Sequence, residues 1–161
     1  AQVGRTSGEK EKIDLNELVA ESMDLIAPPA NIRTEIETPL PVLYIEKSPI
    51  EQLFQNLLSN AVKYMDKPEG IIKIGAVEEA GFWKFYISDN GPGIEKEYFD
   101  RIFQLFQTLQ ARDQFESTGI GLTIVKKVVE NFGGKVWVDS KPGEGTTFYF
   151  TLPKFLMQAG Q

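Results

Sequence analysis

Cysteine and histidine are both absent from the 161 residues. Without cysteine the chain forms no disulfide and no thiolate metal site. Without histidine it contains no imidazole base, no histidine ligand for zinc and no histidine that could be phosphorylated. No apolar run is long enough to cross a bilayer, and no signal-peptide pattern opens the sequence. Basic residues are outnumbered, 17 against 23 acidic residues, so a broad nucleic-acid surface is not expected. These absences favour one soluble, cytoplasmic domain that binds no nucleic acid.

The pattern of apolar residues predicts three helices and about six strands. Leu15, Leu18 and Ile26 follow helical spacing, with Asp14 or Asn16 as the cap. Two further helices are expected over residues 48–65 and 119–132. Strands are expected over residues 31–37, 41–46, 71–78, 82–88, 135–140 and 146–152. Helices packed on one face of a mixed sheet, an α/β sandwich, would bury these elements.

The helix expected over residues 48–65 carries a polar stripe beside its apolar face. At about 100° per residue, Asn56, Asn60 and Lys63 fall together, away from the apolar positions. An asparagine oxygen can ligate a hard cation without adding charge, and a lysine can balance phosphate charge. The stripe therefore suits a magnesium-phosphate group. A solvated helix face explains the same residues, and the stripe alone favours that simpler interpretation.

Two segments that contain glycine are typical of ligand contacts. In residues 89–94, DNGPGI, Gly91 and Gly93 allow the backbone to approach a flat ligand, and Asp89 can accept a hydrogen bond from an amine such as that of adenine. Residues 117–122, STGIGL, open a helix whose free N–H groups form a phosphate site. A tight turn and a lid hinge, respectively, are alternative explanations of the two segments.

The order of five blocks decides between these interpretations. The chain reads QNLLSNAVKY, DNGPGI, RIFQLF, TGIGLTIVKKVVE and GGKVWVDSKPGEGTTFYFTLP, in that order. This arrangement resembles the histidine-kinase branch of the GHKL ATP-binding superfamily, which includes gyrase and MutL proteins, and the resemblance covers about residues 13–153. It implies a Bergerat fold, a two-layer α/β sandwich in which three helices cover one face of a mixed sheet. It also implies that ATP and magnesium are the ligands, with residues 95–118 as a mobile ATP lid.

The resemblance further implies a role for each motif residue. Asn60, helped by Asn56, would coordinate magnesium, and Asn56 and Lys63 would lie at the catalytic centre. Asp89 would bind the adenine amine. The other nucleotide contacts would come from Tyr64, Gly91, Gly93, Ile94, Phe103, Phe106, Thr118, Gly119, Ile120, Gly121, Leu122 and Thr146. Of these, Phe103 and Phe106 would form the F box of the lid.

The chain departs from the family pattern in the lid. Ser117 stands where the phosphate loop often begins with a further glycine. Gln107 and Thr108 occupy a region where many relatives carry a basic residue, and Arg112 is a substitute for it. The lid residue that contacts the terminal phosphate is therefore left open.

Position 56 separates kinases from ATPases by its chemistry. Superfamily members that hydrolyse ATP resemble one another in carrying a glutamate four residues before the magnesium asparagine, where this chain has Asn56. An amide cannot take up a proton at neutral pH, so negligible hydrolysis is expected. The phosphate would instead pass to a histidine on a separate dimerisation module, and then to the receiver domain of a response regulator. An anti-sigma-type serine kinase, an ATPase module and a degenerate regulatory domain remain as alternatives.

The expected organisation has three parts. Residues 1–12 would be a linker remnant from the dimerisation module, residues 13–153 the catalytic domain, and residues 154–161 a tail. The isolated domain would then be monomeric and the full-length kinase a homodimer, either cytoplasmic or the cytoplasmic part of a membrane sensor.

Overall fold

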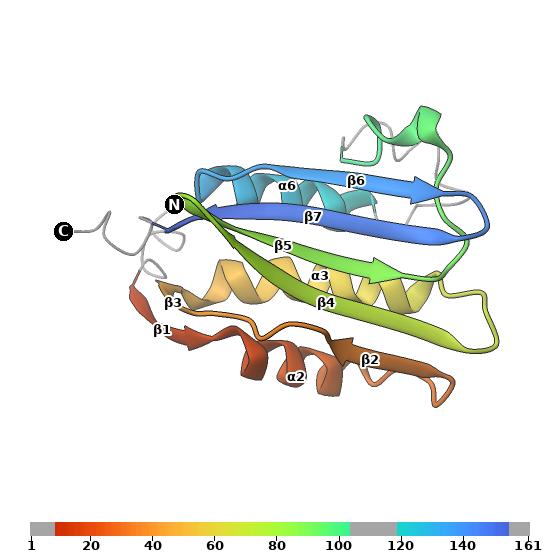
Figure 1. Cartoon of the computed structure of the whole chain (residues 1–161), viewed down its shortest axis with the longest axis horizontal. Coiled ribbons are helices and arrows are strands. Elements are labelled where there is room, and N and C mark those ends of the chain that lie inside the picture. The colour runs from red at the N-terminus through yellow and green to blue at the C-terminus, as the bar shows by residue number, and fades with distance from the viewer. Residues whose placement is uncertain (1–8, 104–118, 155–161) are drawn as a thin grey trace.

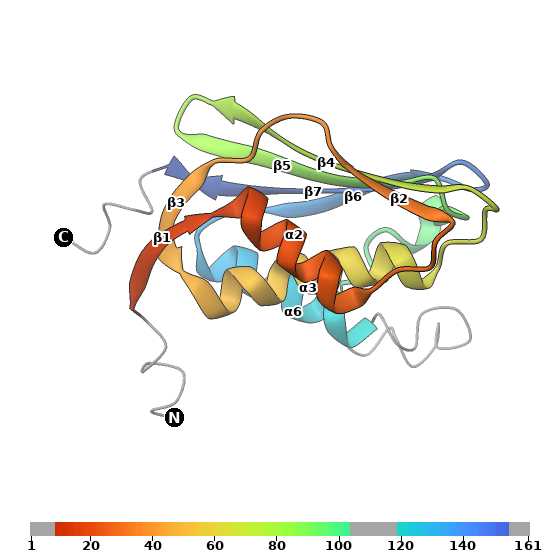
Figure 2. The same cartoon turned by 90° about the horizontal axis from the view of Figure 1, so that it is seen from below.

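The computed structural model describes residues 9–103 and 119–154, which form two layers (Figure 1). One layer consists of three helices: α2 (Leu15–Ile26), α3 (Lys47–Lys63) and α6 (Gly119–Asn131). The other layer is built from strands: β1 (Lys10–Asp14), β2 (Ile32–Ile36), β3 (Val42–Glu46), β4 (Gly70–Glu79), β5 (Phe82–Asp89), β6 (Val136–Lys141) and β7 (Gly145–Pro153). Figure 2 shows all three helices on the same side of the large sheet. This is the predicted α/β sandwich. No helix in the described ranges is long and apolar enough to span a membrane.

The large sheet has the strand order β2-β4-β5-β7-β6, and β1 pairs with β3 in a separate two-stranded sheet. Only β2 and β4 run parallel within the large sheet, which makes it mixed. The register pairs Asp89, at the end of β5, with Thr146, at the start of β7. Ser140 of β6 also pairs with Thr146. Three residues that are far apart in the sequence are therefore neighbours at one end of the sheet.

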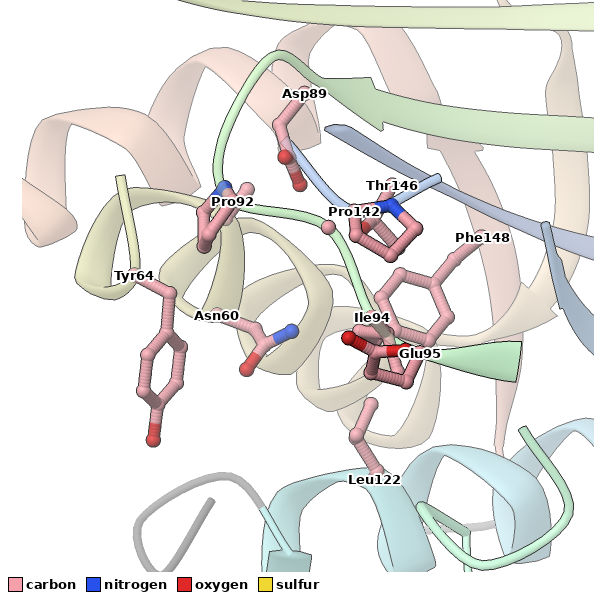
Figure 3. A pocket seen from close by; sticks show the side chains of 12 residues that line it. Asn60, Tyr64, Asp89, Pro92, Ile94, Glu95, Leu122, Pro142, Thr146 and Phe148 are labelled. Carbon is pink, nitrogen blue, oxygen red and sulfur yellow. The ribbon is translucent and has the colours of Figure 1, made fainter. Parts of the chain in front are cut away.

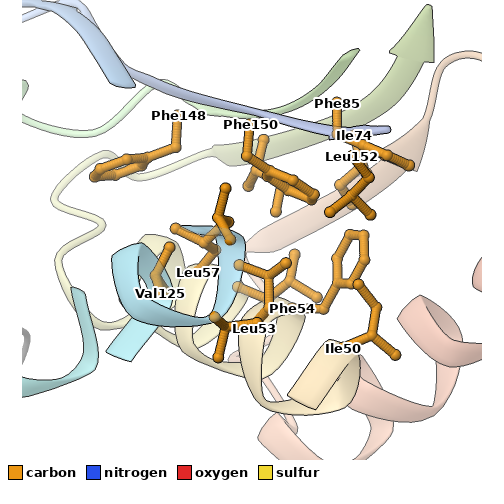
Figure 4. Packing of buried hydrophobic residues seen from close by; sticks show 14 of the residues in the cluster. Ile50, Leu53, Phe54, Leu57, Ile74, Phe85, Val125, Phe148, Phe150 and Leu152 are labelled. Atoms are coloured by element: carbon orange, nitrogen blue, oxygen red, sulfur yellow. The ribbon is translucent and has the colours of Figure 1, made fainter. Parts of the chain in front are cut away.

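Aromatic rings join the two layers in the core (Figure 4). Phe54 of α3 meets Phe85 and Phe150 edge to face, with ring centroids 6.1 and 5.6 Å apart. Phe85 and Phe150 stack on each other at 4.8 Å, and all three rings are fully buried. Such ring pairs contribute roughly 0.5–1.5 kcal/mol each beyond the burial of their area. This packing holds α3, which carries the polar stripe, rigidly against the sheet.

Most predicted elements are confirmed to within a few residues. Asp14 caps α2 by accepting a hydrogen bond from the backbone N–H of Asn16 at 2.9 Å, and the helix ends at Ala27, before Pro28. One strand differs from the prediction: residues 10–12, expected in the linker, lie in β1. Only Ile13 of that strand is buried, so its sequence shows little hydrophobic alternation. Paired structure therefore begins before the predicted boundary at residue 13.

Candidate functional site

A cavity of about 450 Å³ lies between the helix layer and the end of the sheet where β5 and β7 meet. Figure 3 shows Asp89 and Thr146 on its sheet side, Asn60 and Tyr64 on the side of α3, and Leu122 on α6. Its wall consists of Asn60, Ala61, Tyr64, Asp89, Pro92, Gly93, Ile94, Glu95, Leu122, Pro142, Thr146 and Phe148. The wall therefore brings together seven of the predicted contact residues: Asn60, Tyr64, Asp89, Gly93, Ile94, Leu122 and Thr146. The volume suits a small organic ligand.

Asp89 carries a partly buried carboxylate in the wall of this cavity. Its Oδ1 accepts a hydrogen bond from the Gly91 backbone N–H at 2.8 Å, and the backbone N–H of Thr146 also donates to the carboxylate. Burial raises the pKa of Asp89 to about 6, although these two hydrogen bonds and the nearby Lys67 lower it. The group is therefore an ionised acceptor above about pH 6, held in a fixed direction.

The loop after Asp89 interlocks with the β6–β7 turn through glycines. Gly93 has φ +79°, and a side chain there would run into the carbonyl of Lys141. Gly145 has φ +132°, and a side chain there would run into the carbonyl of Asp89. Gly93 lines the cavity, as predicted for a ligand contact, and it also passes close to the protein's own backbone. Gly91 does not line the cavity, although its N–H orients Asp89.

The polar stripe of α3 divides into two parts. Asn60 lines the cavity, and its Oδ1 is buried without a hydrogen-bond partner among the described residues. Asn56 Nδ2 is likewise buried and unpaired in the described part of the chain, but Asn56 does not line the cavity. Lys63 is exposed and lies outside the wall, so its predicted role toward the nucleotide stays a prediction. An unpaired buried amide oxygen costs about 1–3 kcal/mol, which a cation at the cavity would offset.

A family comparison agrees with this geometry. The model described as "Histidine kinase-, DNA gyrase B-, and HSP90-like ATPase" matches residues 45–155, more than half of the chain. The chain belongs to this family. The match spans α3, the Asp89 loop, α6 and the β6–β7 turn, which together form the cavity.

Relatives identify the branch of the family. Cyanobacterial phytochrome B of Nostoc sp. is 40% identical over 157 residues, which cover 94% of this chain and 21% of that protein. The adaptive-response sensory kinase SasA of Prochlorococcus marinus is 37% identical, covering 76% of this chain and 32% of that protein. The solved catalytic domain of histidine kinase ThkA superposes with a TM-score of 0.74 at 29% identity, covering 91% of this chain and 96% of that one. The chain is an ATP-binding catalytic domain of a sensor histidine kinase and spans about a fifth of the length of its phytochrome relative.

The segment predicted to contact the phosphates is described only in part. Gly119, Ile120 and Gly121 form the first turn of α6, so their backbone N–H groups stand at the helix N-terminus beside Leu122 in the cavity wall. Phe103 is buried, and its ring meets Phe148 edge to face at 6.0 Å. Phe106 and Thr118 lie outside the described residues, as do Ser117 and most of the predicted lid.

Several site residues were missed in the sequence. Ser140 Oγ accepts a hydrogen bond from the Ile94 N–H at 2.7 Å and donates to the Gly145 carbonyl at 2.7 Å. Lys67 Nζ donates to the Gly91 carbonyl at 3.0 Å and fixes the other side of the same loop. Apolar wall is supplied by Ala61, Pro92, Pro142 and Phe148. The alternation of β7 could have indicated Phe148, whereas the contacts of Ser140 and Lys67 depend on which segments are neighbours in space.

Proposed function

We propose that this domain binds Mg-ATP in the cavity and donates the γ-phosphate to a histidine on a separate dimerisation module. The observation that carries the proposal is the pair of polar groups in the cavity wall. Asp89 offers a fixed carboxylate at the sheet end, and Asn60 offers an unpaired amide oxygen from α3. The first suits an amine on a planar base and the second suits a hard cation.

The base would enter at Asp89. The ionised carboxylate accepts a hydrogen bond from the exocyclic amine of adenine, while Ile94, Leu122 and Phe148 supply apolar surface for the ring. A cavity wall that is mainly apolar, with a few oriented polar groups, is the usual design for such ligands. Two backbone N–H groups already hold the Asp89 side chain in one orientation. The side chain therefore loses little conformational entropy when the base binds.

The triphosphate would extend from the base toward Asn60 and the start of α6. Asn60 fits a magnesium ligand because its buried oxygen has no partner among the described residues. In residues 9–103 and 119–154, no group of three or more His, Cys, Asp or Glu side chains is placed to hold a metal. The remaining ligands would therefore be phosphate oxygens and water, as is usual for magnesium with nucleotides. Bound magnesium would neutralise charge on the phosphates, and the N–H groups of Gly119 and Gly121 would add the field of the helix N-terminus.

The acceptor of the phosphate has to come from outside this chain. The bond between the γ-phosphorus and its bridging oxygen breaks, a bond from phosphorus to an imidazole nitrogen forms, and ADP leaves. The sequence holds no histidine, and Asn56 cannot act as a base toward water. The domain's own contribution is then to orient ATP and exclude water until the histidine module docks. A receiver domain of a response regulator would take the phosphate in the next step.

Transfer to a separate module tests this proposal. The chain is mixed with the dimerisation module of the same kinase and with ATP labelled at the γ-phosphate. Label is expected on the module, and its loss is expected when the acceptor histidine is replaced by alanine. Asn60→Ala should abolish transfer, whereas the exposed neighbour Ser59→Ala should retain it. A chain that binds ATP but never labels the module would contradict the proposal.

A further inference from the structure

Ser140 is not among the predicted contact residues and does not line the cavity, yet its hydroxyl lies at the centre of a hydrogen-bond cluster behind the cavity wall. Its Oγ is 2.7 Å from the Ile94 N, 2.7 Å from the Gly145 carbonyl oxygen and 2.9 Å from Thr146 Oγ1. The three partners belong to the loop after Asp89 and to the start of β7. Ser140 therefore joins the two segments that form the sheet end of the cavity.

The proton positions in this cluster follow from elementary valence. A carbonyl oxygen cannot donate, so the short contact with Gly145 requires the single proton of the Ser140 hydroxyl. The Ile94 N–H can only donate, so Ser140 Oγ accepts there. In the remaining contact, Ser140 has no second proton to give, and Thr146 must be the donor. Ser140 thus donates once and accepts twice, which satisfies its hydroxyl completely.

The consequence concerns Thr146, which lines the cavity and is buried. Because its hydroxyl proton is directed at Ser140, any further hydrogen bond that Thr146 Oγ1 makes is one that it accepts. Asp89 lies beside it, paired across the β5–β7 ladder and hydrogen-bonded to the Thr146 N–H. Both side chains therefore present acceptors, and only acceptors, at this end of the cavity.

We propose that Ser140 is a positioning residue for base selection: by fixing the direction of the Thr146 hydroxyl, it makes the pocket accept a base with an amine and reject one with a carbonyl in its place. The inference rests on the proposed placement of the base at Asp89. A purine with an amine at C6 offers donors to two acceptors. A purine with oxygen at C6 would bring a third acceptor against them and leave buried groups unpaired, which sites of this kind penalise strongly.

The test compares two nucleotides that differ at C6, where a carbonyl replaces the amine, and at the adjacent N1, which then carries a proton. Dissociation constants for ADP and inosine diphosphate are measured by calorimetry on the chain and on its variants. The native chain should prefer ADP by at least about tenfold. Ser140→Ala frees the Thr146 hydroxyl to donate into the cavity, so inosine diphosphate should bind more tightly and the preference should fall by about fivefold. Ser140→Thr keeps a hydroxyl and should keep the preference.

The outcomes separate the possible failures. A Ser140→Ala variant that binds both nucleotides more weakly at an unchanged ratio would show a merely structural residue and overturn the proposal. If that variant does not fold, the preference for ADP is measured on Thr146→Val instead, because this variant keeps the hydrogen bond between Ser140 and Gly145. Its preference should also fall, and an unchanged ratio would overturn the proposal. In the Thr146→Val background, Ser140→Ala should change the ratio no further. The placement of the base would instead be refuted if the native chain bound neither nucleotide. It would also be refuted if the Asp89→Asn variant bound ADP with the same affinity as the native chain.

Discussion

Gly145 and Asp89 touch through their backbones: the α-carbon of Gly145 faces the Asp89 carbonyl so closely that no side chain fits between them. The contact sets the β6–β7 turn against the residue proposed to recognise the base. Gly145→Ala should therefore lower the free energy of unfolding by at least about 3 kcal/mol, through steric overlap and a positive φ. Urea unfolding measures the loss.

Gly143 in the same turn provides the matched control. It has φ +82°, but a side chain added there would meet nothing within 4 Å. Gly143→Ala should cost only the roughly 1–2 kcal/mol of the left-handed conformation, and ADP should still bind. Equal losses for the two variants would show that the contact with Asp89 has no particular importance.

Asp89 predicts an unusual dependence of stability on pH. Burial raises the pKa of this carboxyl to about 6 from an ordinary value of 3.8. The folded state then binds a proton more readily than the unfolded state, so this group's contribution to stability increases as pH falls from about 7 toward 4. Asp89→Asn should be more stable than the native chain at pH 7 by about 1–2 kcal/mol, with the difference vanishing near pH 4. A variant less stable than the native chain at pH 7 would contradict this account.

Binding should show the opposite dependence on pH. An adenine amine needs the ionised carboxylate, so the affinity of the native chain for ADP should fall as pH decreases through about 6. Calorimetry between pH 5 and 8 measures this, and Asp89→Asn corrects for the titration of the nucleotide's own phosphates. A native chain whose affinity follows that of the variant at every pH would exclude Asp89 from the base site.

Phe103 was predicted as a lid residue, but its packing is that of a core residue. Its ring is buried against Phe148, and its carbonyl accepts a hydrogen bond from Thr123 Oγ1 at 3.3 Å. Phe103→Ala should therefore destabilise the nucleotide-free chain by about 3 kcal/mol. Thermal or urea unfolding without ligand measures this. If Phe103 contributed only when a lid closes over ATP, the ligand-free variant would unfold like the native chain.

Asn56 predicts the absence of hydrolysis. The resemblance aligns Asn56 with the glutamate that activates water in relatives that hydrolyse ATP, and an amide cannot act as a base, so the chain should release phosphate from ATP no faster than Asn56→Ala does. A phosphate-release assay under saturating Mg-ATP makes the comparison. Release that is well above the spontaneous rate and is lost in Asn56→Ala would mean that water, and not a histidine, is the acceptor.

The fold was largely predictable because its elements have strong periodicity. The buried residues of α3 recur at helical spacing, and those of β7 alternate, so both elements could be located from the sequence. Strand β1 could not, because Ile13 is its only buried residue and its pairing with β3 depends on segments about thirty residues apart.

The site was predictable where chemistry resides in one segment. Asp89 and Asn60 were expected from local motifs, and the structure places both in the cavity wall. Ser140 was not expected, because its importance depends on three contacts across β6, β7 and the Asp89 loop. Gly93 lies in the cavity wall as expected, but its close approach to the Lys141 backbone was not expected, because a sequence shows that a glycine is present but not which backbone it approaches.

The most direct test of the central claim is calorimetric titration of a non-hydrolysable ATP analogue into the chain and into Asn60→Ala, with and without magnesium. The account predicts that magnesium tightens binding to the native chain and that Asn60→Ala removes this gain while retaining the weaker, magnesium-free binding through Asp89. Ser59→Ala, one residue away on the exposed face, should behave like the native chain. A folded native chain that fails to bind the analogue at millimolar concentration, or an equal gain from magnesium in Asn60→Ala, would contradict the account.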